Sequence, residues 1–323
     1  MSDSPPSPQL RTQPVKKALS IAVSYSDRPG IDDWYKIKHA HKDSDLIVDL
    51  LKKTFGYPPE NITIMKDDGQ CCPPTRNNIA MHHLVSNTMP GDHLVFHISG
   101  HWSLRKRTQR NSATEGQEEN GIEELFWPCD VAIEHHDAVG KYILNDQIKD
   151  ILVNGVPPGV NLVIISDCCH FGTIADLPHC HPDREKRTKA LRIKEKERSK
   201  LVESPATESD EEESTERERA WRCSNGTRQG IPNVVCWSSC MSPQAAYNPN
   251  NAAGVFIQLL VEAICENVEQ THQELLHTVT ERIEQIANVM SNCASVLNLP
   301  KPYLSALYSQ TESLAISKIF GEK

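Results

Sequence analysis

The chain of 323 residues is long enough to bury a sizeable core, and its 38% hydrophobic and 24% charged residues are typical of soluble globular proteins. A formal net charge of -9 argues against nucleic-acid binding through bulk positive charge. No apolar run approaches the length of a membrane span, and the start lacks the charged and apolar regions of a secretion signal. The 11 cysteines therefore favour free thiols in a reducing cytoplasm. We expect a cytoplasmic monomer that binds neither nucleic acid nor membranes.

Apolar runs and helix-like periodicity alternate after a Pro- and Ser-rich start at 1–16, which we expect to be disordered. Short apolar runs bounded by turn residues indicate strands, and apolar residues spaced three or four apart indicate helices. These patterns predict strands at 18–24, 61–65, 93–98, 126–130, 161–166, 233–238 and 313–319. They predict helices at 43–55, 75–87, 145–154, 252–267 and 271–290. The last helix opens with Thr271 and Glu274 at the spacing of a capping box.

Two polar stretches interrupt this pattern. Residues 102–120 lack periodicity and are predicted to form a loop. Residues 181–230 carry a basic block and then an acidic block, which predicts an exposed and largely disordered insertion. Elsewhere the alternation of strands and helices predicts an α/β fold, with a mostly parallel central sheet covered by helices on both faces.

Two of the predicted strands end in chemically reactive residues. Residues 164–169 read Ile-Ile-Ser-Asp-Cys-Cys, and the stretch 94–101 ends in Ser-Gly-His. Parallel sheets bind ligands beyond the carboxyl ends of their strands, so we expect these two ends to form a site. Side chains alternate along a strand, so Asp167 and Cys169 share one face, as do Ser99 and His101. In most proteins, an arbitrary cysteine and histidine are a small core residue and an ordinary loop residue. The alternation of side chains alone does not exclude that interpretation.

The same stretches resemble motifs of the metacaspases, which are cysteine peptidases of the caspase-like clan. Residues 97–101, His-Ile-Ser-Gly-His, resemble the family's His-Tyr-Ser-Gly-His-Gly, and residues 167–173 resemble its Asp-Ser-Cys-His-Ser-Gly-Thr. Residues 120–130 resemble its Asp-Gly-x-Asp-Glu-x-Ile-x-Pro-x-Asp. The resemblance implies the caspase-like fold. A larger part at 17–180 would hold the catalytic residues, and a smaller part at 231–323 would complete the same sheet after the insertion.

The resemblance implies that the chain is a cysteine endopeptidase. Cys169 would be the nucleophile, His101 its acid–base partner, and the backbone N–H groups of Trp102 and Cys169 would stabilise the oxyanion. A register slip of one residue would make Cys168 the nucleophile instead. Trp102 replaces a family glycine, where a positive φ would be costly, and Phe171 replaces a small residue. The alternative function is therefore an impaired pseudo-peptidase that acts as a binding or signalling module.

Asp43, Ser99 and Asp167 match the positions with which the family reads the side chain before the scissile bond. Two carboxylates in one pocket favour a cation, so the resemblance implies cleavage after Arg or Lys in peptide or protein substrates. Taken singly, Asp43 could cap the helix it begins, and Asp167 could accept backbone hydrogen bonds at a strand end. The dense basic residues at 184–200 would then be sites of self-cleavage.

Four positions resemble the family's calcium-binding residues, namely Glu123, Asn145, Asp146 and Asp176. Their oxygens suit calcium, although solvated surface acids would give the same pattern. The stretch 179–181, His-Cys-His, has the residue types of a zinc site. No second ligand pair follows it closely, so surface composition is the better interpretation.

Overall fold

The computed structural model describes residues 11, 13–26, 33–79, 81–106, 122–131, 142–167, 174–175, 177, 179–181, 232–239, 254–291, 302–307 and 313–323. The predicted disorder at 1–16 falls mostly outside these residues, and so does the predicted insertion apart from its first residue. None of the described helices is long and apolar enough to cross a membrane.

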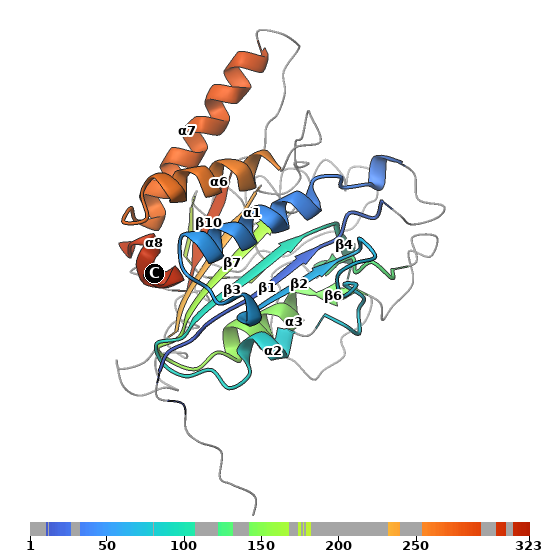
Figure 1. Ribbon diagram of the computed structural model, residues 1–323. Coiled ribbons are helices and arrows are strands. Elements are labelled where there is room, and N and C mark those ends of the chain that lie inside the picture. The colour runs from blue at the N-terminus through green and yellow to red at the C-terminus, as the bar shows by residue number, and fades with distance from the viewer. Residues whose placement is uncertain are drawn as a thin grey trace, which may run out of the picture.

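A seven-stranded sheet forms the centre of the described chain (Figure 1). Its strands lie in the order β2 (Ile62–Lys66), β1 (Lys16–Ala22), β3 (His93–Ser99), β7 (Asn161–Asp167), β9 (Asn233–Ser238), β10 (Tyr303–Ala306) and β8 (His179–His181). The strands from β2 to β9 pair in parallel, whereas β10 is antiparallel to both of its neighbours. The predicted α/β class with a mostly parallel central sheet is confirmed.

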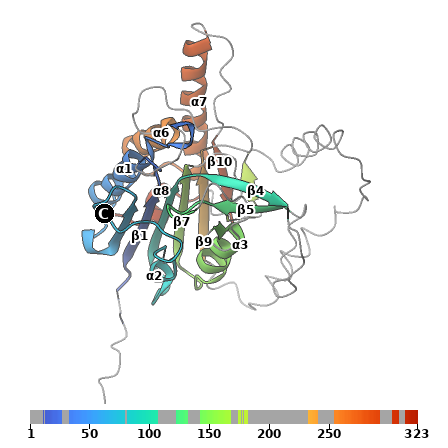
Figure 2. The same cartoon turned by 90° about the vertical axis from the view of Figure 1, so that its right-hand side faces the viewer.

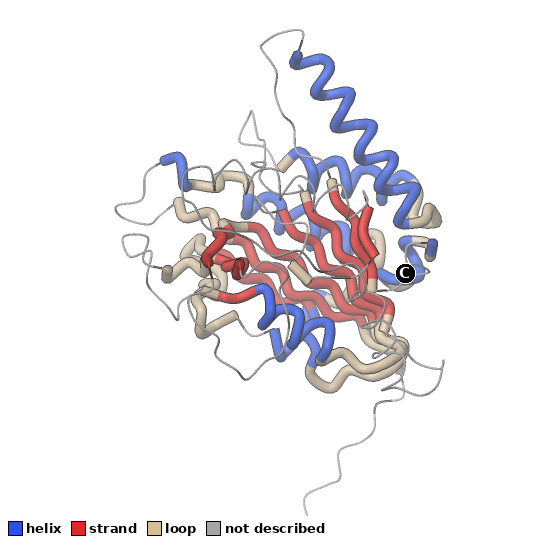
Figure 3. The backbone as a smooth tube through the Cα atoms, turned by 180° about the vertical axis from the view of Figure 1, so that it is seen from behind, coloured by secondary structure: helices blue, strands red, loops and turns tan. Residues whose placement is uncertain are grey.

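Helices cover both faces of this sheet (Figure 3). One face carries α1 (Ala40–Lys53), α6 (Val255–Glu266), α7 (His272–Ser291) and α8 (Ile316–Phe320). The other face carries α2 (Met81–Val85) and α3 (Asn145–Ile148), which continues into a π-helical segment at Lys149–Asn154. Side chains alternate along the strands, so each face has its own core. Val95 packs in the core under α1 and α6, and Phe96 packs in the core that includes residues of α2 and α3.

A second, small sheet stands beside the carboxyl end of β3 (Figure 2). It consists of β4 (Trp102–Lys106), β5 (Ile122–Phe126) and β6 (Ile143–Leu144), which are paired antiparallel. Two short 3-10 helices complete the described elements, η1 (Asp33–Tyr35) and η2 (Pro59–Asn61). The predicted capping box of α7 is present, because Glu274 accepts the Thr271 N–H at 2.7 Å and donates its own N–H to the Thr271 hydroxyl at 3.2 Å.

The sequence patterns misplaced three elements on the α2 side of the molecule. The helix predicted at 75–87 is wrong in extent, since only α2 is helical there. The segment before it is held by tertiary bonds instead: the Arg76 N–H donates to the Asp130 carboxylate at 2.9 Å. The loop predicted at 102–120 is wrong for β4, which is stabilised by pairing with β5. The strand predicted at 126–130 likewise lies earlier and ends at Phe126.

The carboxyl end of the chain also differs from the prediction. The strand predicted at 313–319 is wrong, because this segment contains the helix α8. Ile316, Ile319 and Phe320 are buried with helical spacing against the core of the α1 face. A further strand of the sheet is β10, whose four residues are too short a run for periodicity to distinguish.

Candidate active site

The two reactive strand ends lie side by side at the carboxyl ends of two central strands of the main sheet. β3 and β7 are parallel neighbours, and their register places Ser99 opposite Asp167. His101 follows Ser99 by two residues at the point where the chain turns into β4. Cys168 and Cys169 come directly after β7 but lie outside the described residues, as does Phe171.

Three aromatic side chains surround the imidazole of His101. Tyr25 stacks on it with ring centroids 5.0 Å apart, and Tyr35 and Trp127 meet it edge-on at 5.9 Å each. The Tyr25 hydroxyl accepts the backbone N–H of His101 at 3.0 Å and donates to the Trp127 carbonyl at 2.6 Å. These contacts fix both the ring and the backbone of His101, which is only half-buried.

A backbone carbonyl determines which imidazole nitrogen carries a proton. Nε2 of His101 lies 2.5 Å from the carbonyl oxygen of Tyr35. A carbonyl oxygen can only accept, so Nε2 must donate, and in the neutral ring Nδ1 is then the basic nitrogen. Sequence patterns missed Tyr35 because its contribution comes from the main chain, in a polar stretch without periodicity.

Trp102 lies in an ordinary strand conformation. The described non-glycine residues with positive φ are Tyr25 and Asn87, so the backbone cost considered for Trp102 does not arise. Its indole is buried against Phe126, with ring centroids 5.4 Å apart. The tryptophan therefore fills core space at the base of the small sheet while keeping its backbone N–H beside His101.

A cluster of buried acidic and polar residues, named the acidic pocket, lies next to the two strand ends. Asp43 comes from α1, Ser99 from β3 and Asp167 from β7, and their exposed fractions are 0%, 0% and 2%. His39, which directly precedes α1, joins them: its Nε2 lies 3.8 Å from Oδ2 of Asp43. One ligand-type atom from each of His39, Asp43 and Asp167 lies within 4.8 Å of the others.

The pocket carboxylates do not play the simpler roles open from sequence. Asp43 lies within α1, whose N-cap is His39, and its Oδ1 accepts the N–H of Gly254 at 2.6 Å. Both carboxylate oxygens of Asp167 and Oδ2 of Asp43 are buried without a hydrogen-bond partner among the described residues outside the acidic pocket. Neither the helix-cap role nor the strand-end role therefore accounts for these side chains.

Burial dominates the electrostatics of the pocket. It raises the pKa of Asp43 well above the ordinary value, and the negative charge of Asp167 raises it further, whereas the Gly254 N–H opposes the rise. Burial lowers the pKa of His39, and the Asp167 carboxylate opposes that shift. The pocket thus holds two acids without a compensating cation among the described residues, which favours binding of a positively charged group.

Gly254 closes the pocket from the start of α6. A Cβ at this position would lie 2.2 Å from Oδ2 of Asp167 and 3.3 Å from Oδ2 of Asp43. Such contacts leave no room for any side chain, so glycine is required for the backbone to reach Asp43. Sequence patterns could not identify His39 or Gly254, because both act through a tertiary contact between α1 and α6.

The motifs and this geometry agree with a comparison against protein families. The model for the metacaspase, peptidase C14 domain matches residues 16–178, just over half of the chain. This chain belongs to the metacaspase family. The matched region runs from β1 past the end of β7 and contains His101, the acidic pocket and the two adjacent cysteines.

Curated metacaspases resemble the chain over most of its length. Metacaspase-1A of Aspergillus oryzae is 27% identical over 288 residues, which cover 83% of this chain and 65% of the relative. Metacaspase-1 of Sclerotinia sclerotiorum is 27% identical over 310 residues, which cover 90% of this chain and 68% of the relative. The chain therefore spans about two thirds of the length of these relatives.

Two solved structures superpose on the chain over most of its length. A crystal structure of a protein from Geobacter sulfurreducens superposes with a TM-score of 0.53 at 13% identity, covering 94% of this chain and 98% of that one. Caspase-1 from Spodoptera frugiperda gives a TM-score of 0.49 at 11% identity, covering 97% of this chain and 92% of that one. The family match and the strand order of the main sheet confirm the predicted caspase-like fold.

The calcium positions of this metacaspase chain are described in part. The register of β5 and β6 places Leu125 opposite Leu144, so Glu123 and Asp146 lie near the same end of the small sheet. Asn145 is buried at the start of α3, and Asp146 follows it. The side chain of Glu123 and all of Asp176 lie outside the described residues. The donors are carboxylate and amide oxygens, which calcium prefers, and the site stays a prediction.

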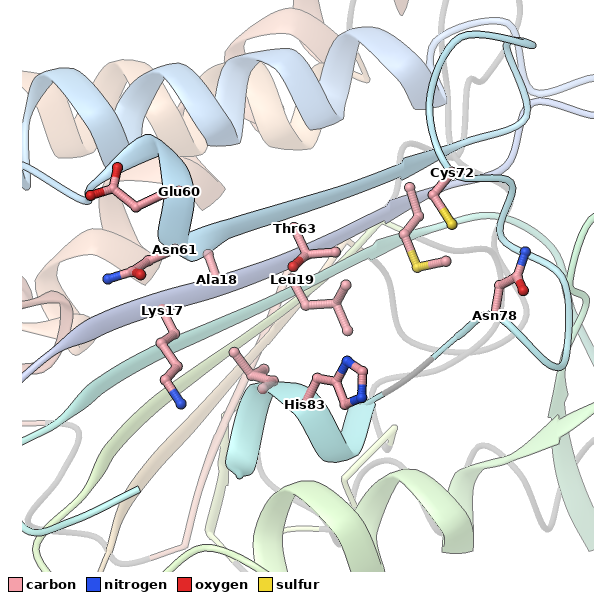
Figure 4. A pocket seen from close by; sticks show the side chains of 11 residues that line it. Lys17, Ala18, Leu19, Glu60, Asn61, Thr63, Cys72, Asn78 and His83 are labelled. Carbon is pink, nitrogen blue, oxygen red and sulfur yellow. The ribbon is translucent and has the colours of Figure 1, made fainter. Parts of the chain in front are cut away.

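Two further features lie away from the pocket. His179–His181 forms β8 at the far edge of the sheet, and only His179 has a described side chain. A hollow of about 410 Å³ lies at the opposite edge, between β2 and α2 (Figure 4). Its lining mixes Lys17, Glu60 and His83 with apolar side chains, and it contains none of the predicted catalytic or pocket residues.

Proposed function

We propose that this metacaspase chain is a cysteine endopeptidase that hydrolyses peptide bonds after Arg or Lys. The observation that carries the proposal is the acidic pocket: Asp43 and Asp167 are buried together beside the strand ends that lead to His101 and Cys169. A substrate guanidinium or ammonium group would supply the positive charge that these two carboxylates lack. The buried Ser99 hydroxyl adds a polar contact for the same group.

The proposed chemistry is acyl transfer through a thioester. The Cys169 thiolate attacks the scissile carbonyl, and backbone N–H groups of Cys169 and Trp102 stabilise the oxyanion. His101 protonates the leaving amine and then takes a proton from the water that hydrolyses the thioester. The bond to the Tyr35 carbonyl supports a defined role for each nitrogen, because it retains the proton on Nε2 and leaves Nδ1 for proton exchange.

The proposed substrate preference follows from charge. Arg in a pocket with two carboxylates can form charge-assisted hydrogen bonds, whereas an Asp there would face like charges in a desolvated site. Arg or Lys before the scissile bond should therefore be strongly preferred over Asp.

Calcium assistance and self-processing form the second part of the proposal. Asn145 and Asp146, with Glu123 and Asp176, would hold the ion through their oxygens near the small sheet that begins at Trp102. Bound calcium would supply positive charge that draws these acidic segments together. The proposal is that this orders the neighbourhood of His101, and that cleavage within 184–200 accompanies activation.

Hydrolysis of fluorogenic peptides ending in Arg, Lys or Asp tests this function, with and without calcium. Wild type should cleave the Arg and Lys peptides, and Asp167→Asn should reduce kcat/KM for them by about 10- to 100-fold, the value of one charged hydrogen bond. Asp150→Asn is the control, because Asp150 is exposed and bonds only Asn154 at 2.9 Å among the described contacts. Cleavage of Asp peptides alone would overturn the pocket assignment. Full activity in excess chelator would overturn the calcium part.

A further inference from the structure

His39 gives the acidic pocket a chemistry beyond recognition of a basic side chain. It lies four residues before Asp43, so the two side chains share one face at the start of α1, and Nε2 of His39 is 3.8 Å from Oδ2 of Asp43. Asp167 reaches the same point from the end of β7. The three residues thus combine one imidazole and two carboxylates from two elements of the fold.

The atoms that face one another have no partner among the described residues outside the acidic pocket. Nε2 of His39, Oδ2 of Asp43 and both oxygens of Asp167 are buried, and no described residue beyond this pocket forms a hydrogen bond with them. His39 is 7% exposed, and the two acids are 0% and 2% exposed. Burying polar atoms without partners is costly unless a ligand or ion satisfies them. Such a cluster therefore points to a bound group and does not describe a solvated acidic surface.

We infer that His39, Asp43 and Asp167 form a binding site for a divalent transition metal, with Zn²⁺ as the best fit. Zn²⁺ binds neutral imidazole and carboxylates and is stable with three protein ligands and one open position. Calcium fits less well, because it requires six to eight oxygens. The two carboxylates would balance the charge of the ion.

The distances require a small contraction around the metal. Bonds of about 2.0–2.2 Å in a tetrahedral arrangement place neighbouring ligand atoms about 3.4 Å apart. The His39 and Asp43 atoms are at 3.8 Å, and all three ligand atoms lie within 4.8 Å of one another. Side-chain rotations that move each ligand atom by about 1 Å are sufficient to close the site around an ion of this size.

The site would make metal and substrate mutually exclusive. The carboxylates of Asp43 and Asp167 that bind the metal are those assigned to the Arg or Lys side chain, so this part of the inference rests on the proposed function. Bound Zn²⁺ should occupy the pocket and exclude a guanidinium group. Zn²⁺ bound here should therefore inhibit cleavage of Arg peptides. This inhibition requires His39 and not Cys169, unlike inhibition by a metal that binds the catalytic thiol.

Zn²⁺ binding measured by calorimetry on the Cys169→Ala chain tests the site directly. This background removes both self-cleavage and the proposed nucleophile as a metal ligand. Adding His39→Ala or Asp167→Asn should weaken binding at this site by at least about tenfold, since even outer-shell partners of a metal contribute that much. The absorption spectrum of bound Co²⁺ reports the type of its ligands. The part of this spectrum that disappears in the His39→Ala chain should contain no thiolate-to-metal charge-transfer band, because no cysteine belongs to the site.

His277→Ala is the matched control. His277 also pairs with a carboxylate four residues away, Glu281 at 3.2 Å, but its side chain is 75% exposed. Zn²⁺ binding should be unchanged in that variant, and circular dichroism should show that all variants are folded. Equal Zn²⁺ affinity with and without His39→Ala, or with and without Asp167→Asn, would overturn the metal site.

Agmatine, a small guanidinium probe, separates this inference from the proposed function. Displacement of agmatine by Zn²⁺ supports a shared pocket. If Zn²⁺ binding depends on His39 but agmatine does not compete, the metal site stands and the assignment of the Arg pocket fails. If Arg peptides are cleaved and the Zn²⁺ affinity is the same with and without His39, the metal site is wrong and the peptidase function is supported.

Discussion

The phenol of Tyr25 contacts His101 in two ways. Its ring stacks on the imidazole at 5.0 Å, and its hydroxyl accepts the His101 backbone N–H at 3.0 Å. Tyr25 itself has a φ of 57°, a left-handed conformation that is unusual for a bulky residue. Strained backbone of this kind persists where the surrounding contacts determine it, and here those contacts position the proposed acid–base residue.

Replacing Tyr25 with phenylalanine should lower both stability and turnover. The His101 N–H and the Trp127 carbonyl would lose their partner, at a cost of about 1–3 kcal/mol in the free energy of unfolding. Tyr57→Phe is the control, because its buried hydroxyl also donates to a carbonyl, that of Phe320 at 2.9 Å, in the core of the α1 face. Urea unfolding should show similar losses in both variants, whereas kcat should fall only for Tyr25→Phe. Equal kcat values for the Tyr25→Phe and Tyr57→Phe variants would show that Tyr25 does not position His101.

The identity of the nucleophile can be tested with three variants. Cys169→Ala and His101→Ala should each abolish turnover of an Arg peptide, and Cys168→Ala should retain most of it. The reason is the strand register: Ser99 pairs with Asp167, and alternation past β7 places Cys169 on the face of Asp167. Alkylation by iodoacetamide at neutral pH gives a second measurement and should slow in the His101→Ala variant. An inactive Cys168→Ala with an active Cys169→Ala would show that the register is wrong.

Affinity for Arg substrates should depend on pH through Asp43. Its pKa is raised by burial and by Asp167, so the neutral form persists into a pH range where an exposed aspartate is already charged. As pH rises through the raised pKa, Asp43 gains its charge and KM for an Arg peptide should fall. The Asp43→Asn variant should have a higher KM without this fall. A KM profile of the wild type identical to that of Asp43→Asn would contradict the assignment.

Asp67 should contribute to stability in a pH-dependent manner. Its partial burial raises the pKa, but hydrogen bonds from His41 and from the N–H groups of Ser24 and Tyr25 outweigh that effect and lower it overall. A lowered carboxyl pKa stabilises the fold above the unfolded value of about 4, and this contribution is lost as pH falls through the folded value.

The Asp67→Asn variant tests that contribution. At neutral pH its free energy of unfolding, measured in urea, should be about 1–3 kcal/mol lower than that of wild type. The difference should shrink as the pH falls below about 4. Asp49→Asn is the control, because Asp49 is exposed and, in the part of the chain that the structure describes, pairs with Lys53 alone on the surface of α1. A pH-independent difference would show that charge is not the cause.

Self-cleavage is expected within residues 184–200, which lie outside the described chain. Their Arg and Lys residues match the proposed pocket, and they follow closely after β7 in sequence, which raises their effective concentration near Cys169. Mass spectrometry after incubation with calcium should find two fragments for wild type and an intact Cys169→Ala chain. The fragments should remain together, because β9 pairs with β7 along most of its length. Equal nicking in both proteins would indicate a contaminating protease.

Sequence patterns predicted those parts of the site that depend on where the strands end. The sequence predicted that the ends of β3 and β7 would form one site, and the register of these two strands places Ser99 opposite Asp167. Sequence patterns did not predict β4, because its stability comes from pairing with β5 and not from its own residues. They also missed His39 and the Tyr35 carbonyl, which act through a tertiary contact and through the main chain.

Gly254 has a consequence for the time at which the pocket is completed during synthesis. Asp43 is near the beginning of the chain, and its backbone donor is 211 positions later, at the start of α6. A nascent chain that has not yet reached residue 254 lacks the Gly254 N–H that bonds Asp43. The pocket therefore closes only after the strand β9 and the beginning of α6 have left the ribosome. Nascent chains shorter than this have the reactive strand ends without the finished pocket, which delays selective peptide binding until the fold is nearly complete.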